Sequence, residues 1–230
     1  MKKQIVLRQL FDARIVAVIR SKNRETALRS VRACIEGGIR AVEITYTVPD
    51  ASGIIRELSG LYAGDGVLVG AGTVIDAETA RTAMLAGASF LVSPTADPGL
   101  IGICNRYRAV CVAGAFTPNE VKVALDAGAD LIKIFPASLC TPSYIRVLHG
   151  PFPQADFMVT GSMSFETAGD WLAGGASLIG VGGLLTDPAE KAAMLRKLIY
   201  GKTVKGMQNL PASFAQSGVV RLIDGRLPEE

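Results

Sequence analysis

The sequence contains a single histidine, His149, among its 230 residues. A zinc-dependent hydrolase or a metal-dependent aldolase normally binds its metal through two or three imidazoles, which this chain cannot supply. Proton transfer must then fall to Glu, Asp, Lys, Tyr or a bound water. We therefore expect no metal site, and we interpret His149 as a residue at a helix C-terminus, where its charge complements the helix dipole.

Closely spaced cysteine pairs are also absent. The four cysteines lie far apart and form no CxxC pair: Cys34, Cys104, Cys111 and Cys140. This spacing is typical of reduced structural thiols in a cytosolic protein rather than of a disulfide framework or a zinc site.

Long apolar runs and blocks of basic residues are missing as well. No apolar run reaches the roughly 18 residues of a membrane span, and Arg8 and Asp12 interrupt the apolar N-terminal stretch before it resembles a signal-peptide core. The net charge of +3 is spread along the chain. We therefore expect a cytoplasmic protein that binds neither membrane nor nucleic acid, and a small-molecule function is favoured.

What the chain does contain is a regular alternation of short apolar runs with helical segments. Eight runs are candidate strands, each followed by a plausible helix: residues 15–20, 40–45, 67–72, 89–93, 109–113, 130–134, 156–160 and 178–182. This α/β pattern predicts a closed (β/α)8 TIM barrel, with a doubly wound open sheet as the alternative. We expect one barrel domain over residues 1–202 and a C-terminal surface extension over residues 203–230.

An internal repeat supports closure of the barrel. A short sequence motif, in which a glycine ends a helix and a strand follows, recurs before every second predicted strand. It occurs at residues 36–43, 85–92, 126–133 and 173–180. Five residues after the aligned glycines lie Glu43, Val92, Lys133 and Gly180. Because alternate strands of a barrel fill common interior layers, these four residues should share one layer, with Glu43 facing Lys133.

Lys133 is the strongest candidate for chemistry because it lies inside an apolar β-type run, residues 130–136. Loss of hydration disfavours an ammonium there, so the free amine, a nucleophile toward carbonyls, becomes populated. Two other interpretations remain open. The lysine can extend to solvent at the strand end, or it can form a purely structural buried ion pair with a carboxylate such as Glu43.

Glycine-rich loops follow the seventh and eighth predicted strands, where barrels of this type often hold a phosphate. The residues concerned are Gly161, Ser162, Gly182 and Gly183. Glycine permits close approach of backbone amides to an anion, so we expect a phosphate cradle here. The alternative is that these glycines only relieve crowding in tight turns.

Eight motifs occur in a recognisable order: VEIT at 42–45, GAGTV at 70–74, VSP at 92–94, FTPNE at 116–120, IKIFPA at 132–137, GPFP at 150–153, TG at 160–161 and GVG at 180–182. No single motif is specific. Together they resemble the 2-dehydro-3-deoxy-phosphogluconate / 4-hydroxy-2-oxoglutarate aldolase family over roughly residues 14–200.

The resemblance implies a class I aldolase that needs no cofactor and is usually a homotrimeric (β/α)8 barrel. Lys133 matches the Schiff-base lysine and Glu43 the general acid/base. Thr73 matches a residue that binds the 2-keto acid carboxylate, and Pro94 and Phe135 match residues that line the pocket. The implied reaction, typical of carbohydrate metabolism and the Entner–Doudoroff pathway, cleaves 2-dehydro-3-deoxy-6-phosphogluconate or 4-hydroxy-2-oxoglutarate to pyruvate and an aldehyde, glyceraldehyde 3-phosphate or glyoxylate.

Thr47 departs from the family pattern. The best-known motif reads Glu-Val-Thr-Leu-Arg, and its arginine binds the substrate carboxylate. Thr47 stands in that place here and carries no charge. Carboxylate binding is then expected from Thr73, backbone amides and Arg20, whose alternative role is a salt bridge at the barrel rim.

The loops predicted to bind the phosphate also depart from the family pattern. The familiar Thr-Gly-Gly reads Thr160-Gly161-Ser162, and Gly183 replaces the expected serine. Ser162 can donate in its place, and an unphosphorylated substrate remains an alternative. A different class of function is a barrel that binds a phosphorylated sugar without a Schiff base, as an isomerase or a sensor.

Overall fold

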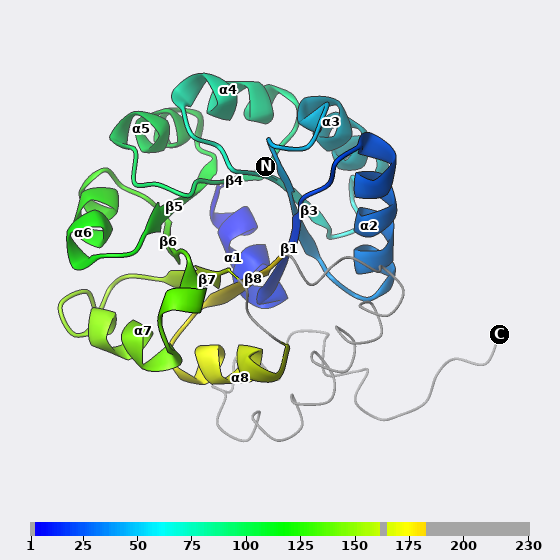
Figure 1. The fold of residues 1–230 in the computed structure, drawn as a ribbon. Helices are drawn as coiled ribbons and strands as arrows, with labels where there is room; N and C mark the ends of the chain where they lie inside the picture. The colour runs from blue at the N-terminus through cyan, green and yellow to red at the C-terminus, as the bar shows by residue number, and fades with distance from the viewer. Residues whose placement is uncertain (1–2, 162–164, 183–230) are drawn as a thin grey trace.

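A computed structural model of the chain describes residues 3–161 and 165–182 (Figure 1). Within these residues, eight parallel strands pair in sequence order and β8 returns to β1, which closes the barrel. The strands are β1 (Ile15–Ile19), β2 (Ala41–Thr45), β3 (Leu68–Gly72), β4 (Phe90–Val92), β5 (Val110–Ala115), β6 (Leu131–Ile134), β7 (Phe157–Thr160) and β8 (Leu178–Val181). The prediction of a closed barrel is confirmed, and the open-sheet alternative is wrong.

A ring of helices surrounds the barrel (Figure 1). Together with the helix at the N-terminus they are α1 (Lys3–Ala13), α2 (Arg24–Glu36), α3 (Ala51–Leu61), α4 (Ala77–Leu85), α5 (Pro98–Tyr107), α6 (Pro118–Asp126), α7 (Pro142–His149) and α8 (Phe165–Ala173), with a short 3-10 helix η1 (Ala137–Leu139) after β6. His149 ends α7, as expected.

Local signals in the sequence explain where the helices begin and end. Asn23, Asp76 and Thr117 each accept a hydrogen bond from a backbone amide in the first turn of the following helix, which satisfies a donor that has no partner within that helix. The four glycines of the internal repeat all have positive φ, between 85° and 107°. Since that conformation favours glycine, the repeat marks four equivalent helix ends.

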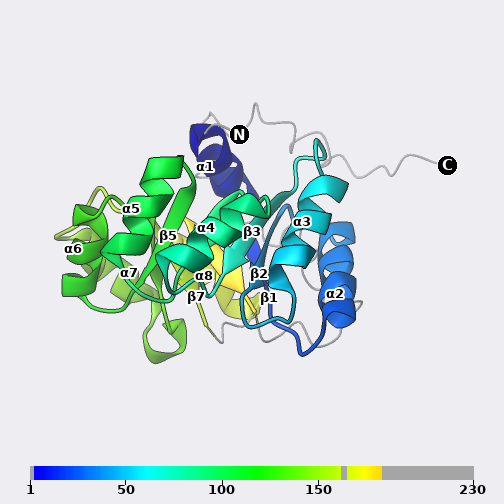
Figure 2. The same ribbon diagram turned by 90° about the horizontal axis from the view of Figure 1, so that it is seen from above.

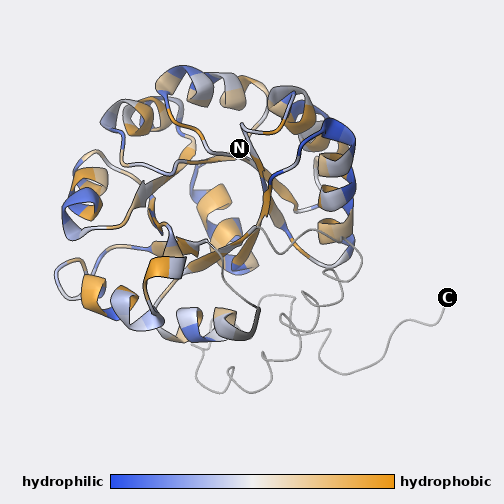
Figure 3. Cartoon of the chain, in the orientation of Figure 1, coloured by the Kyte–Doolittle hydropathy of each residue, from blue (hydrophilic) through white to orange (hydrophobic). Residues whose placement is uncertain are grey.

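The apolar side chains form two layers. The larger one lies between the strands and the helices, whose apolar faces turn toward the barrel (Figure 3). The smaller one fills the barrel interior from the first half of the strands, and Val6 and Leu10 of α1 pack against it. Helix α1 therefore closes the end of the barrel where the strands begin (Figure 2). Helix α1 does not cover the other end of the barrel, where the strands finish.

None of the helices in residues 3–161 and 165–182 is long and apolar enough to cross a membrane. The same residues contain no group of three or more His, Cys, Asp or Glu side chains that could hold a metal ion. The predicted boundary at residue 202 and the extension over 203–230 lie outside the described residues.

Candidate active site

Glu43 and Lys133 lie on the inner face of the barrel. Ala41 and Leu131, two residues before them on β2 and β6, belong to the cluster that fills the interior, and side chains two apart on a strand share a face. Glu43 is 1% exposed and Lys133 is 6% exposed. The interpretation in which Lys133 extends to solvent is therefore wrong.

The layer predicted from the repeat is present. Val92 of β4 belongs to the interior cluster. Gly180 of β8 has no room for a side chain, because a Cβ atom there would lie 2.3 Å from Thr160 Oγ1 and 2.6 Å from Met158 Cε. The equivalent position on β4 is thus an apolar wall, as the sequence indicated, whereas the opening expected at Gly180 is filled by the side chains of Thr160 and Met158.

The Glu43 carboxylate occupies a tight space without hydrogen bonds. A Cβ atom at Gly72 of β3 would lie 2.4 Å from Glu43 Oε1, so glycine at this position makes room for the carboxylate. Both carboxylate oxygens are buried, and neither accepts a hydrogen bond from any described residue. Burial raises the pKa of Glu43 above its usual 4.5, while the positive charges of Lys133 and Arg20 lower it by less.

Lys133 forms no ion pair within 4.0 Å with any carboxylate of the described residues, so the structure does not show the structural ion pair considered above. Its Nζ lies 5.2 Å from the centre of the Phe135 ring. An unpaired amine and an unpaired carboxylate buried in the same barrel interior are expensive to maintain, and a functional site is where such pairs are found.

Arg20, Thr47 and Thr73 come together where β1, β2 and β3 end. Arg20 donates to Thr47 Oγ1 (3.0 Å) and to Thr73 Oγ1 (3.3 Å). Thr73 has a φ of 54°, in the left-handed region that β-branched residues rarely adopt. The guanidinium forms no salt bridge with a described carboxylate, and its charge acts on Glu43. A cation and two hydroxyls at these strand ends can bind a carboxylate.

Pro94 and Phe135 follow the ends of β4 and β6. They line a hollow of about 370 Å³ at this face of the barrel. Pro94 is half-buried, and a Cβ atom at Gly114 of β5 would lie 2.1 Å from its carbonyl carbon. Phe135 is 40% exposed, and its peptide bond to Pro136 is cis. Both residues are therefore at the end of the barrel where the strands finish, and their predicted place in the substrate pocket stays a prediction.

The glycine loops after β7 and β8 are only partly described. Gly161 has a φ of 119°, and a Cβ atom there would lie 3.2 Å from Ala137 N. Gly182 follows β8, with space for a Cβ atom 3.5 Å from Val18 Cβ. Ser162 and Gly183 lie outside the described residues.

The family model of KDPG and KHG aldolase, named for 2-dehydro-3-deoxy-6-phosphogluconate and 4-hydroxy-2-oxoglutarate, matches residues 6–197. The chain belongs to the KDPG and KHG aldolase family. It is an aldolase, a carbon–carbon lyase.

Individual relatives agree with this assignment. The chain is 30% identical to the 2-dehydro-3-deoxy-phosphogluconate aldolase of Treponema pallidum, covering 82% of this chain and 89% of the relative. It is 33% identical to the 2-dehydro-3-deoxy-6-phosphogalactonate aldolase of Escherichia coli, covering 73% and 82%. The KDPG aldolase of Legionella pneumophila, solved with pyruvate captured as a covalent carbinolamine intermediate, superposes with a TM-score of 0.73 at 26% identity, covering 86% and 96%.

Sequence reasoning did not select Thr160 as a site residue of this aldolase. Its hydroxyl is buried on β7, lies against Gly180, and has no hydrogen-bond partner among the described residues. The signal that could have found it is strand alternation, since Met158 two residues earlier belongs to the interior cluster. A buried hydroxyl without a partner leaves a polar contact available to a substrate.

Proposed function

We propose that this aldolase cleaves a 2-keto-3-deoxy-4-hydroxy acid through a Schiff base on Lys133 and releases pyruvate and an aldehyde. The observation that carries the proposal is the pair of buried, unpaired side chains, Lys133 and Glu43, in one interior layer. The covalent carbinolamine of the Legionella pneumophila relative supports the same chemistry.

The reaction begins when the neutral amine of Lys133 attacks the C2 ketone carbon of the substrate. The carbinolamine that forms loses water to give an iminium. The iminium then accepts the electron pair of the C3–C4 bond as Glu43 removes the proton of the C4 hydroxyl, and the aldehyde leaves. The resulting enamine takes a proton at C3, and hydrolysis of the iminium releases pyruvate and restores the lysine.

Glu43 is suited to several of these proton transfers. A general acid/base works best when its pKa is near the working pH, and burial raises the pKa of this carboxyl above its usual 4.5. One carboxylate can then accept a proton in one step and return it in the next, directly or through a water. No other carboxylate among the described residues is buried.

Arg20, Thr47 and Thr73 are proposed to bind the carboxylate of the keto acid. Two hydroxyls already hold the Arg20 guanidinium at the ends of β1, β2 and β3, so its position does not depend on the substrate. This arrangement compensates for the uncharged Thr47, which stands where the best-known family pattern has arginine.

Replacing Arg20 by Gln is expected to raise KM by about 10- to 100-fold and to change kcat little, because the carboxylate contact is present in both the ground state and the transition state. The measurement is pyruvate release as a function of substrate concentration. Lys22→Gln is the matched control, since Lys22 is an exposed cation two residues away. A drop in kcat with unchanged KM would contradict a role in carboxylate binding.

The substrate is proposed to carry a phosphate, held by Gly161, Ser162, Gly182 and Gly183. The phosphogluconate and phosphogalactonate aldolases among the relatives support a phosphorylated six-carbon substrate. A panel that compares pyruvate release from both phosphorylated acids, their unphosphorylated forms and 4-hydroxy-2-oxoglutarate tests this. We expect kcat/KM to be highest for a phosphorylated acid, and equal values with and without phosphate would remove the phosphate site.

We propose further that the enzyme is a cytoplasmic homotrimer, as the family resemblance implies. Light scattering on the purified chain should then give about 73 kDa, three times the 24.2 kDa of one chain. A mass of one chain would contradict this assembly.

A further inference from the structure

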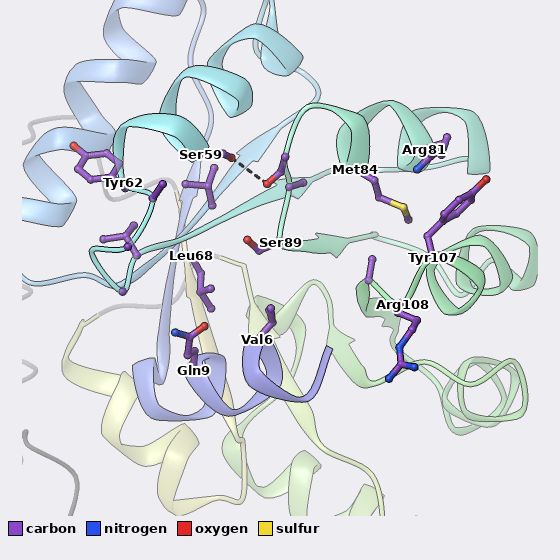
Figure 4. A pocket seen from close by; sticks show the side chains of 18 residues that line it. Val6, Gln9, Ser59, Tyr62, Leu68, Arg81, Met84, Ser89, Tyr107 and Arg108 are labelled. Carbon is purple, nitrogen blue, oxygen red and sulfur yellow. Dashed lines mark hydrogen bonds between the residues drawn. The ribbon is translucent and has the colours of Figure 1, made fainter. Parts of the chain in front are cut away.

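A second hollow, of about 610 Å³, lies at the end of the barrel opposite the proposed active site. It is bounded by the C-terminal ends of α3, α4 and α5, by the first residues of β3 and by α1 (Figure 4). Its volume is within the range of small-molecule sites in proteins. The chemistry proposed for Lys133 and Glu43 does not use it.

The charged side chains that line this hollow in the described part of the chain are all positive. Arg81 and Arg108 line it, and none of its lining residues in the described part of the chain is an aspartate or a glutamate. The guanidinium of Arg108 forms no ion pair or hydrogen bond with any described residue. Two cations without a carboxylate favour an anionic occupant.

The remaining lining is suited to an apolar ring. Leu68, Met84 and Ala88 give an apolar wall, and Tyr62 and Tyr107 lie on opposite sides (Figure 4). The Arg81 guanidinium lies over the Tyr107 ring, 3.9 Å from its centre. A flat cation stacked on an aromatic ring extends a planar surface against which another ring can pack.

Polar groups without partners also line this hollow. The amide oxygen of Gln9 on α1 is buried and accepts no hydrogen bond from any described residue. The backbone amides of Gly64 and Gly66, which have positive φ, donate to no described carbonyl or side chain. Both glycines are exposed, so only Gln9 is a buried polar group without a partner, and its oxygen suits a ligand that donates a hydrogen bond.

Helix-end electrostatics explain the two arginines only in part. Positive charge near a helix C-terminus is favourable without any ligand, and α4 and α5 both end at this face. Arg106, in the last turn of α5, already provides that charge and does not line the hollow. The interaction with the helix ends therefore does not require Arg108 to stand at the hollow.

We propose that this hollow binds a small organic anion with an apolar ring, such as a nucleotide or an aromatic carboxylate. The ring packs against Met84 and Tyr107, and the anionic group pairs with Arg108 and Arg81. Gln9 belongs to α1, so a ligand that donates a hydrogen bond to Gln9 contacts both that helix and the barrel.

The probe is 8-anilinonaphthalene-1-sulfonate, an aromatic sulfonate, titrated calorimetrically into the full chain. We expect one site per chain, with binding about ten-fold weaker in Arg108→Gln and in Arg81→Gln, because each removes a charged hydrogen-bond donor. The uncharged analogue N-phenyl-1-naphthylamine should bind wild type and both variants alike. Arg106→Gln is the matched control and should bind the sulfonate like wild type, as should Lys133→Met.

Adenosine monophosphate and indole-3-acetate are then added as competitors. Displacement of the probe by one of them assigns a nucleotide or an aromatic carboxylate to the site, and failure of both at millimolar concentration rejects the ligand class. Equal sulfonate affinity in wild type, Arg108→Gln and Arg81→Gln overturns the proposal. So does weaker binding in Arg106→Gln, which would indicate general attraction to charge, or in Lys133→Met, which would place the probe in the active site.

Discussion

Replacing Lys133 by Met is expected to lower kcat/KM for pyruvate release by at least about 10,000-fold, because the variant has no amine to form the covalent intermediate. Methionine is unbranched and apolar, so the variant fills the same buried space on β6 without leaving a charge there. The fold and its thermal stability should therefore be preserved, which circular dichroism will verify.

The same experiment has a direct chemical readout. Borohydride reduction in the presence of pyruvate should add the mass of the reduced pyruvyl group at Lys133 in wild type, located by peptide mass spectrometry. Lys122→Met is the matched control, because Lys122 is an exposed lysine on α6 that pairs with Asp126. Retained activity in Lys133→Met, or a reduced adduct on another residue, would favour a barrel that binds its ligand without Schiff-base chemistry.

Replacing Glu43 by Gln is expected to have opposite effects on activity and stability. Loss of the general acid/base should lower kcat by about 100- to 10,000-fold. The free energy of unfolding at neutral pH should rise by about 1–3 kcal/mol, because the variant no longer holds a buried carboxylate without hydrogen bonds. Pyruvate-release kinetics and urea denaturation measure the two effects.

The pH dependence of that stability difference has a defined sign. Burial raises the pKa of Glu43 in the folded state above its usual 4.5, with the charges of Lys133 and Arg20 opposing the shift. Below pH 4.5 the carboxyl is neutral in the folded and unfolded states, so its contribution to stability is fully present. As the pH rises through the folded-state pKa, ionisation costs more in the folded state, and stability is lost.

The stability advantage of Glu43→Gln should therefore be smallest near pH 4 and largest above the folded-state pKa. Glu25→Gln is the control, because Glu25 is an exposed carboxylate on α2 whose side chain is 84% accessible. An advantage that grows as the pH falls would mean that Glu43 is stabilised in its charged form, and would remove the basis for its role as the proton carrier.

The pairing of Glu43 with Lys133 was predictable because it depends on chain periodicity. The glycine that ends a helix fixes where the next strand begins, and a strand has a side-chain period of two. The residues five positions after each repeated glycine are therefore equivalent interior positions. The eight predicted strands likewise agree with the observed ones to within two residues at each end.

The environment of those side chains was not predictable in the same way. The collision that excludes a side chain at Gly72 involves Glu43 on the neighbouring strand, and the hydroxyls that hold Arg20 come from segments 27 and 53 residues away. Thr160 was missed because the sequence does not show which groups surround its hydroxyl, and so does not show that the hydroxyl has no hydrogen-bond partner.

The sequence by itself determined the eight-fold alternation of strands and helices, the helix ends, and the interior layer that holds an amine and an acid, since all of these follow from local conformational preference and periodicity. Only the tertiary structure decided that these two groups lack partners, that Arg20 lies beside Thr47 and Thr73, and that a cationic hollow forms under α1. Such contacts depend on the distance between strands and helices far apart in the chain, which closure of the barrel sets.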